Sequence, residues 1–170
     1  MTAFDEFFMR MALSEAEKAA HDGETPLGCV IVKPKVVEES HDGHEAIYDF
    51  NPSTAKILSR AHNMTESLQE ATAHAEMLAL SGAFSACGSW RLNGARLYVT
   101  KEPCPMCAGA IVLARLDKIV WGVSDEKRGG ETVFGILSHP GVNHHPRFEK
   151  GLCEEEAKSL LQNFFRSRRA

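Results

Sequence analysis

Four residues in two short motifs have the types and spacing of a metal site. His74 and Glu76 form an H-x-E motif, and Cys104 and Cys107 follow Pro103 in a P-C-x-x-C motif. Zinc binds imidazole and thiolate ligands, usually in a tetrahedral arrangement. Two cysteines three positions apart at a helix start can direct both sulfurs to one point, and the helix dipole favours their thiolate form. The spacing therefore predicts zinc ligation by His74, Cys104 and Cys107.

Glu76 adds chemistry that a purely structural metal site would not use. Three protein ligands leave a fourth position open, as in catalytic zinc sites. A carboxylate beside a zinc-bound water can take its proton and pass it to a leaving group. This combination suits hydrolytic attack on an electrophilic carbon, and the amidine-like C–NH2 carbon of a nucleobase fits well. We therefore predict Glu76 as the catalytic residue and one zinc ion per subunit.

The cysteines and the other histidines also allow different interpretations. A lone C-x-x-C pair could be half of a structural zinc knuckle or a redox pair, but the H-x-E motif beside it disfavours both. His139, His144 and His145 lie in a Pro- and Gly-containing stretch, and we interpret them as surface or RNA-facing side chains. His41 and His44 are interpreted as loop residues.

Length and composition indicate one globular domain over residues 1–170, with 44% hydrophobic and 25% charged residues. No apolar run approaches the roughly 20 residues of a membrane span, so we expect no membrane association. The odd number of cysteines, five, and the lack of a secretory signal favour the cytoplasm. The net charge of −4 (19 − 23) argues against nucleic-acid binding by bulk charge but allows a local basic patch.

The hydrophobic pattern alternates between helices and strands. Phe4, Phe7, Phe8 and Met11 follow helical spacing and predict one apolar stripe on a helix over Ala3–His21. Strands that alternate with helices predict a three-layer α/β domain. The further elements expected are strands over 29–32, 56–59, 97–100 and 118–123, helices over 73–86 and 105–115, and a C-terminal amphipathic helix over 153–170. Residues 34–52 are polar and show no sustained hydrophobic period, so we expect a long loop or an extended hairpin there.

Longer segments around the motifs resemble a known family. Three segments resemble the cytidine deaminase superfamily: TAHAEM (72–77), LYVTKEPC (97–104) and MCAGA (106–110). The segments GVSDEK (122–127), HPGVNH (139–144) and FFRSRR (164–169) narrow the resemblance to the bacterial tRNA-specific adenosine deaminases. The resemblance spans residues 3–33 and 60–170, and residues 34–60 form an insertion that departs from the family pattern.

This resemblance implies a three-layer α/β/α fold with a central mixed sheet, a homodimer, and conversion of the wobble adenosine to inosine in the tRNA anticodon loop. It implies substrate-binding roles for Asn63, Ala75, Glu24, Pro26 and Leu27. It implies RNA contacts at Asp125, Lys127, Asn143, Phe165 and Arg166.

Two alternative functions remain. A free-base or nucleotide deaminase of the guanine or cytosine type would share the motifs, and the third option is a non-catalytic, zinc-stabilised RNA-binding module. Glu76 argues against the module, because a structural site has no use for that acid. The Asp125–Lys127 segment and the C-terminal arginines Arg166, Arg168 and Arg169 favour an RNA substrate.

Overall fold

The computed structural model describes residues 1–39 and 46–169, and a five-stranded mixed sheet forms its centre. The outer strand β4 pairs antiparallel with β1, and β1 pairs antiparallel with β5. The remaining pairs, β5 with β6 and β6 with β7, are parallel. The strands in spatial order are β4 (Lys56–His62), β1 (Gly28–Lys33), β5 (Arg96–Lys101), β6 (Lys118–Val123) and β7 (Arg147–Lys150).

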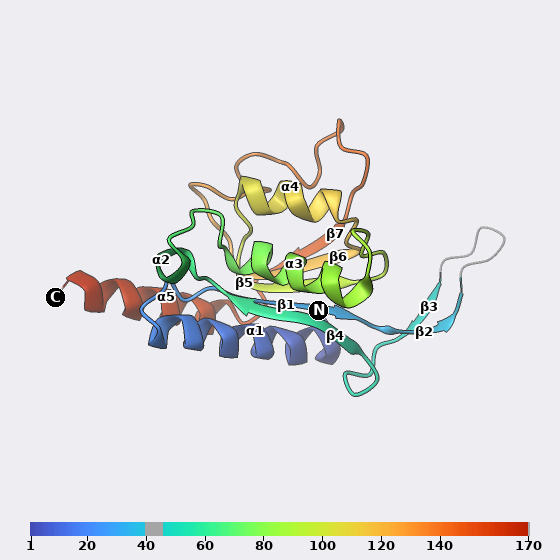
Figure 1. The fold of residues 1–170 in the computed structure, drawn as a ribbon, viewed down its shortest axis with the longest axis horizontal. Helices are drawn as coiled ribbons and strands as arrows, with labels where there is room; N and C mark the ends of the chain where they lie inside the picture. The colour runs from blue at the N-terminus through green and yellow to red at the C-terminus, as the bar shows by residue number, and fades with distance from the viewer. Residues whose placement is uncertain (40–45, 170) are drawn as a thin grey trace.

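Helices cover both faces of this sheet (Figure 1). The first layer contains α1 (Ala3–His21) and α5 (Glu154–Arg169), and the third contains α3 (Ala75–Cys87) and α4 (Pro105–Leu113). The predicted three-layer α/β/α fold with a mixed sheet is therefore confirmed. None of the helices in the described part of the chain has the length and apolarity that crossing a membrane requires.

The first helix packs closely against the sheet, although not with the whole predicted stripe. Phe4 and Phe8 are fully buried, but Phe7 is 49% exposed, so the sheet covers only part of the apolar stripe. The buried face continues through small residues such as Ala12, which lets the helix approach β1. A Cβ added at Gly28 would lie 2.0 Å from the Ala12 carbonyl oxygen, so only glycine fits there.

Residues 34–60 contain the extended hairpin that was one of the two predictions. Strands β2 (Lys35–Glu38) and β3 (Ile47–Asp49) pair antiparallel as a separate two-stranded sheet. The interpretation of His41 and His44 as loop residues lies outside the described residues. Two short elements, α2 (Thr65–Leu68) and β7, were not predicted. Each has four residues, which is too short to show a hydrophobic period.

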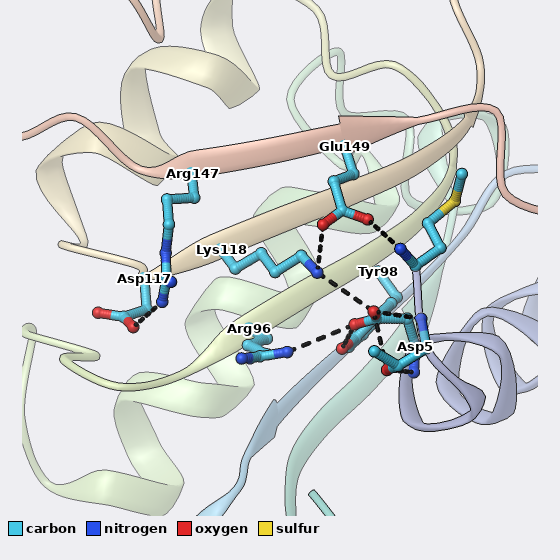
Figure 2. Close-up of polar contacts among 9 residues, drawn as sticks. Asp5, Arg96, Tyr98, Asp117, Lys118, Arg147 and Glu149 are labelled. Carbon is cyan, nitrogen blue, oxygen red and sulfur yellow. Dashed lines mark hydrogen bonds and ion pairs between the residues drawn. The ribbon is translucent and has the colours of Figure 1, made fainter. Parts of the chain in front are cut away.

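A buried polar cluster joins α1 to three strands (Figure 2). The Asp5 carboxylate is fully buried and accepts hydrogen bonds from the Tyr98 hydroxyl at 2.8 Å and from Lys118 Nζ at 3.2 Å. Arg96 lies 3.4 Å from the same carboxylate, and Lys118 also pairs with Glu149 at 2.9 Å. Burial alone would raise the pKa of Asp5, but the hydrogen bonds and the lysine charge hold that pKa below its ordinary value.

Candidate active site

The sheet has two ends, and the predicted metal motif lies at one of them. β4, β5 and β6 finish at this end and β1 begins there, because β1 runs antiparallel to both β4 and β5. We call it the metal end of the sheet. The segment 24–27 precedes β1, Asn63 follows β4, Cys104 follows β5 and Asp125 follows β6, so the topology gathers all four at the metal end.

The three predicted ligands meet where α3 and α4 begin. His74 is the N-cap residue of α3, and Cys104 is the N-cap residue of α4. Pro105 takes the first helical position of α4, where its missing N–H group costs least. His74 Nδ1 lies 3.6 Å from the Sγ atoms of both Cys104 and Cys107, and the two sulfurs are also 3.6 Å apart.

These separations fit a zinc ion. Zinc–sulfur bonds of about 2.3 Å and zinc–nitrogen bonds of about 2.0–2.1 Å in a tetrahedron separate neighbouring ligand atoms by about 3.5–3.8 Å. The observed triangle of 3.6 Å edges falls within that range. Among the described residues, no further His, Cys, Asp or Glu joins the group. The residues present therefore supply three ligands of the kind found in catalytic zinc sites.

The electrostatics of the site favour a thiolate before any cation binds. The hydrogen bond with Cys107 is the main cause that lowers the pKa of Cys104 to about 4, and His74 contributes. The hydrogen bond with Cys104, together with burial, raises the pKa of Cys107. A bound cation would favour deprotonation of the second thiol as well, because metal ligation requires the thiolate.

Glu76 lies in the first turn of α3, two residues after the imidazole ligand. It is only 4% exposed, and its Oε2 atom has no hydrogen-bond partner within the described residues. Burial raises the pKa of Glu76 to about 7. A buried carboxyl group with one uncommitted oxygen can take up and release a proton near neutral pH, as general acid–base catalysis requires.

Asn63 and Glu24, which are far apart in sequence, form one clamp. The Asn63 side-chain N–H donates to Glu24 Oε2 at 3.0 Å, and its backbone N–H donates to the Leu27 carbonyl at 3.0 Å. The Glu24 carboxylate also accepts from the backbone N–H and hydroxyl of Ser67 at 2.7 and 2.8 Å. Burial would raise the pKa of Glu24, but these hydrogen bonds outweigh it and lower that pKa.

The clamp fixes the orientation of the Asn63 amide. The amide nitrogen donates to Glu24 and also to Thr65 Oγ1 at 3.1 Å, so the amide oxygen is the end of the group that remains for a ligand. Leu27 is half-buried and packs against the hydrophobic core under α3, and Pro26 is buried. Ala75 is at the first position of α3, where the backbone N–H has no partner within the helix.

Glu102 is a functional candidate that sequence reasoning missed. It is buried directly before Pro103, and its carboxylate accepts from the backbone N–H groups of Asp125 at 2.9 Å and Thr132 at 2.7 Å. It therefore holds the segment after β6 against the metal loop. The signal was a glutamate directly after the buried run of β5 and directly before Pro103. Gly130 completes the contact by donating its N–H to the Pro103 carbonyl at 2.8 Å.

The structure places four of the five predicted RNA-contact residues near the metal end. Asp125 pairs with Lys101 and caps a turn in which Lys127 is exposed. Phe165 and Arg166 are exposed on the last turns of α5. Arg168 on the same helix donates to the Gly23 carbonyl, which brings α5 beside the clamp.

Asn143 lies elsewhere. Its carbonyl accepts from Arg115, and the neighbouring His144 ring nitrogen lies 2.6 Å from the Leu116 carbonyl. Both contacts are just beyond the C-terminal end of α4, whereas the metal ligands lie at the N-terminal end of that helix. Within one subunit, the structure does not bring Asn143 to the metal site.

Comparison with known proteins agrees with this geometry. The family model described as the cytidine and deoxycytidylate deaminase zinc-binding region matches residues 2–123. The fold and the site thus define a zinc-binding deaminase. The tRNA-specific adenosine deaminase of Bacillus subtilis (strain 168) is 42% identical over 97% of this chain and 91% of its own. That of Aquifex aeolicus (strain VF5) is 40% identical over 96% and 95%.

A solved structure from a study of A-to-I editing by tRNA:A34 deaminases at the wobble position of transfer RNA is similar as well. It superposes with a TM-score of 0.74 at 36% identity and covers 91% of this chain and 99% of its own. The chain belongs to the family of tRNA-specific adenosine deaminases.

Proposed function

We propose that this protein deaminates the wobble adenosine of tRNA to inosine, with one zinc ion per subunit held by His74, Cys104 and Cys107. The observation that carries the proposal is the 3.6 Å triangle of these ligands beside a buried Glu76 oxygen that has no hydrogen-bond partner among the described residues. Relatives at 40–42% identity over nearly the whole chain support tRNA as the substrate. They favour RNA over the alternative of a free base or nucleotide.

The chain's own residues supply proton transfer and orientation. Zinc, when bound, activates a water molecule as the nucleophile at neutral pH. Glu76 takes one proton from the attacking water and delivers it to N1 of the base, and it then carries the second proton from the new C6 hydroxyl group to the exocyclic amine. The C6–N bond breaks, ammonia leaves, and C6 keeps the oxygen as a carbonyl. The Asn63 amide and the Ala75 N–H hold the edge of the flipped base, with Glu24 as the residue that positions Asn63.

A basic surface beside the metal end accommodates the RNA despite the net charge of −4. Arg166, Arg168 and Arg169 follow one another on the last turn of α5, and Phe165 is exposed among them. Arginines bind phosphates, and an exposed aromatic ring can stack on a base. We therefore propose that the anticodon loop is contacted by Phe165, Arg166, Asp125 and Lys127.

An uncovered apolar surface over α4 supports a homodimer. The sequence of α4 is apolar throughout, yet Leu113 is 70% exposed and the described chain places no atom within 4 Å of a Cβ added at Gly109. Val133 and Phe134, in the segment beside α4, are 44% and 54% exposed. A helix that is apolar all round belongs in a buried interface, so a second copy is the occupant we propose. The partner would bring its own Asn143 toward the RNA.

We treat residues 1–170 as one deaminase domain with an insertion over 34–60 and a C-terminal helix over 153–170. We propose that the enzyme acts in the cytoplasm, where a tRNA substrate would be available. The direct experiment incubates the zinc-loaded protein with tRNA carrying a wobble adenosine and quantifies inosine by mass spectrometry. Free adenosine, guanine and cytosine serve as competing substrates. Faster turnover of any of these than of the tRNA would refute the RNA assignment.

A further inference from the structure

A cationic cavity lies at the end of the sheet opposite to the metal site. It measures about 330 Å³ and is formed where β1 finishes, β4 begins and the segment after α3 crosses over. Its floor is apolar, with the buried Leu58 and Leu92, and its charged side chains are Lys33, Lys56 and Arg91. None of the described residues that line it is acidic, although the chain as a whole carries an excess of acids.

The register of the sheet places two of these positive charges where they repel each other and destabilise the fold. Lys33 and Lys56 are directly opposite each other in the antiparallel pair of β1 and β4, so their side chains leave the sheet on the same face. Like charges at directly opposed positions destabilise a sheet. Among the described residues, Lys33, Lys56 and Arg91 have no ion-pair partner at 4.0 Å or less. An anion between them would remove the repulsion.

Neighbouring structure does not neutralise the cluster. The C-terminal end of α3 faces this region, and a helix terminus carries about half a negative charge. Three full positive charges exceed that by about 2.5 charges. Part of the helix end is already satisfied, because Gly88 and Ser89 donate to carbonyls of its last turn.

An exposed aromatic side chain, Trp90, lies next to the cavity and could contact a nucleotide. Trp90 is 60% exposed, and the Arg91 guanidinium stacks over its ring at 4.5 Å. This stacking orders Arg91 in advance and leaves an aromatic surface for a ribose or base. The six residues of β1 place the cavity about 20 Å from the metal end. This distance is short compared with a tRNA arm.

We infer that Lys33, Lys56 and Arg91 form a second RNA-contact site that binds a backbone phosphate of the tRNA outside its anticodon loop. The inference rests on the proposed function for the identity of the polyanion. It gives a role to the end of β1 and the start of β4, which take no part in the catalytic chemistry.

The test compares the zinc-loaded variant Lys33→Gln/Lys56→Gln with the control Lys150→Gln/Lys158→Gln, which removes the same charge from exposed positions elsewhere. Binding to full-length tRNA is measured from about 50 to 200 mM salt. The loss of this one phosphate contact reduces the salt slope by about 0.7–0.9, so the fall in affinity over this range shrinks by about 2.6- to 3.5-fold. The control keeps the wild-type slope. Turnover at saturating tRNA stays unchanged, and the melting temperature does not fall because the like-charge pair is gone.

The inference is overturned if the variant and the control show the same salt slope while wild-type protein makes inosine. It is also overturned if inorganic phosphate binds with an affinity that the variant loses, while tRNA binding stays unchanged, since the site would then serve a free phosphate. A wild-type protein that makes no inosine from tRNA contradicts the proposed function instead, so the two failures are distinguishable.

Discussion

The Glu24 clamp gives a prediction for which stability and activity can be measured separately. Glu24→Gln keeps the shape of the side chain but removes its charge and replaces one acceptor oxygen by an N–H2 donor. That donor would face the Asn63 amide nitrogen or the Ser67 N–H, which now bond to Glu24 at 3.0 and 2.7 Å. Donors facing donors leave buried polar groups unsatisfied.

The expected loss is about 3 kcal/mol, because hydrogen bonds to a charged group contribute about 1.5–3 kcal/mol each and at least one is lost outright. For a chain of this length, each 1 kcal/mol lowers the melting temperature by about 2–4 °C, so the variant should melt about 6–12 °C lower. Asn63 also loses its anchor, and a misplaced substrate contact reduces kcat/KM by about 100-fold.

The assay is thermal unfolding by circular dichroism at several pH values, with Glu17→Gln as the exposed control on α1. Because the folded protein lowers the pKa of Glu24, its contribution is fully present above about pH 4.5 and is lost as the pH falls through the folded value. The difference between wild type and Glu24→Gln should therefore shrink in acid. Equal melting of the Glu24→Gln and Glu17→Gln variants at pH 7, or an undiminished gap at pH 3, would refute the reasoning.

Three further changes have defined outcomes. Gly130→Ala places a Cβ 2.6 Å from the Ala108 Cβ, so we expect a loss of about 1–3 kcal/mol and weaker zinc retention, and unchanged melting would contradict the close contact. Asp5→Asn breaks the buried ionic cluster and should cost about 3–5 kcal/mol in urea unfolding, whereas a loss below 1 kcal/mol would show that the cluster is not coupled. Cys104→Ser should release zinc and abolish deamination, whereas the control Cys87→Ser should retain both. Atomic absorption measures the zinc content, and the inosine yield measures deamination. If Cys104→Ser retained its zinc, Cys104 would be excluded as a ligand.

The sequence predicted the parts of the molecule that depend on local spacing. Zinc ligands at two helix starts follow from short motifs, and the structure brings His74, Cys104 and Cys107 together as expected. Buried strands such as β6 were predicted because they are short apolar runs between polar ends. The roles of the ligands and of Glu76 remain predictions, which the Cys104→Ser and Glu76→Gln variants test.

Contacts between distant segments could not be predicted in this way. Glu24 and Asn63 are 39 positions apart, and only the antiparallel pairing of β1 and β4 brings them together. The role of Glu102 likewise depends on where the chain returns after β6. Phe7 shares the helical stripe with Phe4 and Phe8 but is exposed, because the sheet covers only part of α1. Local periodicity does not show how far a neighbouring layer extends.

The central claim is that Glu76 carries the proton in a reaction at a zinc site formed by His74, Cys104 and Cys107. The most direct measurement is the inosine yield at the tRNA wobble position for wild type and Glu76→Gln, each with its zinc content determined on the same sample. We predict one zinc per chain in both proteins and a rate lower by about 10²–10⁴-fold in the variant. A variant that keeps its zinc and converts adenosine at the wild-type rate would contradict the account.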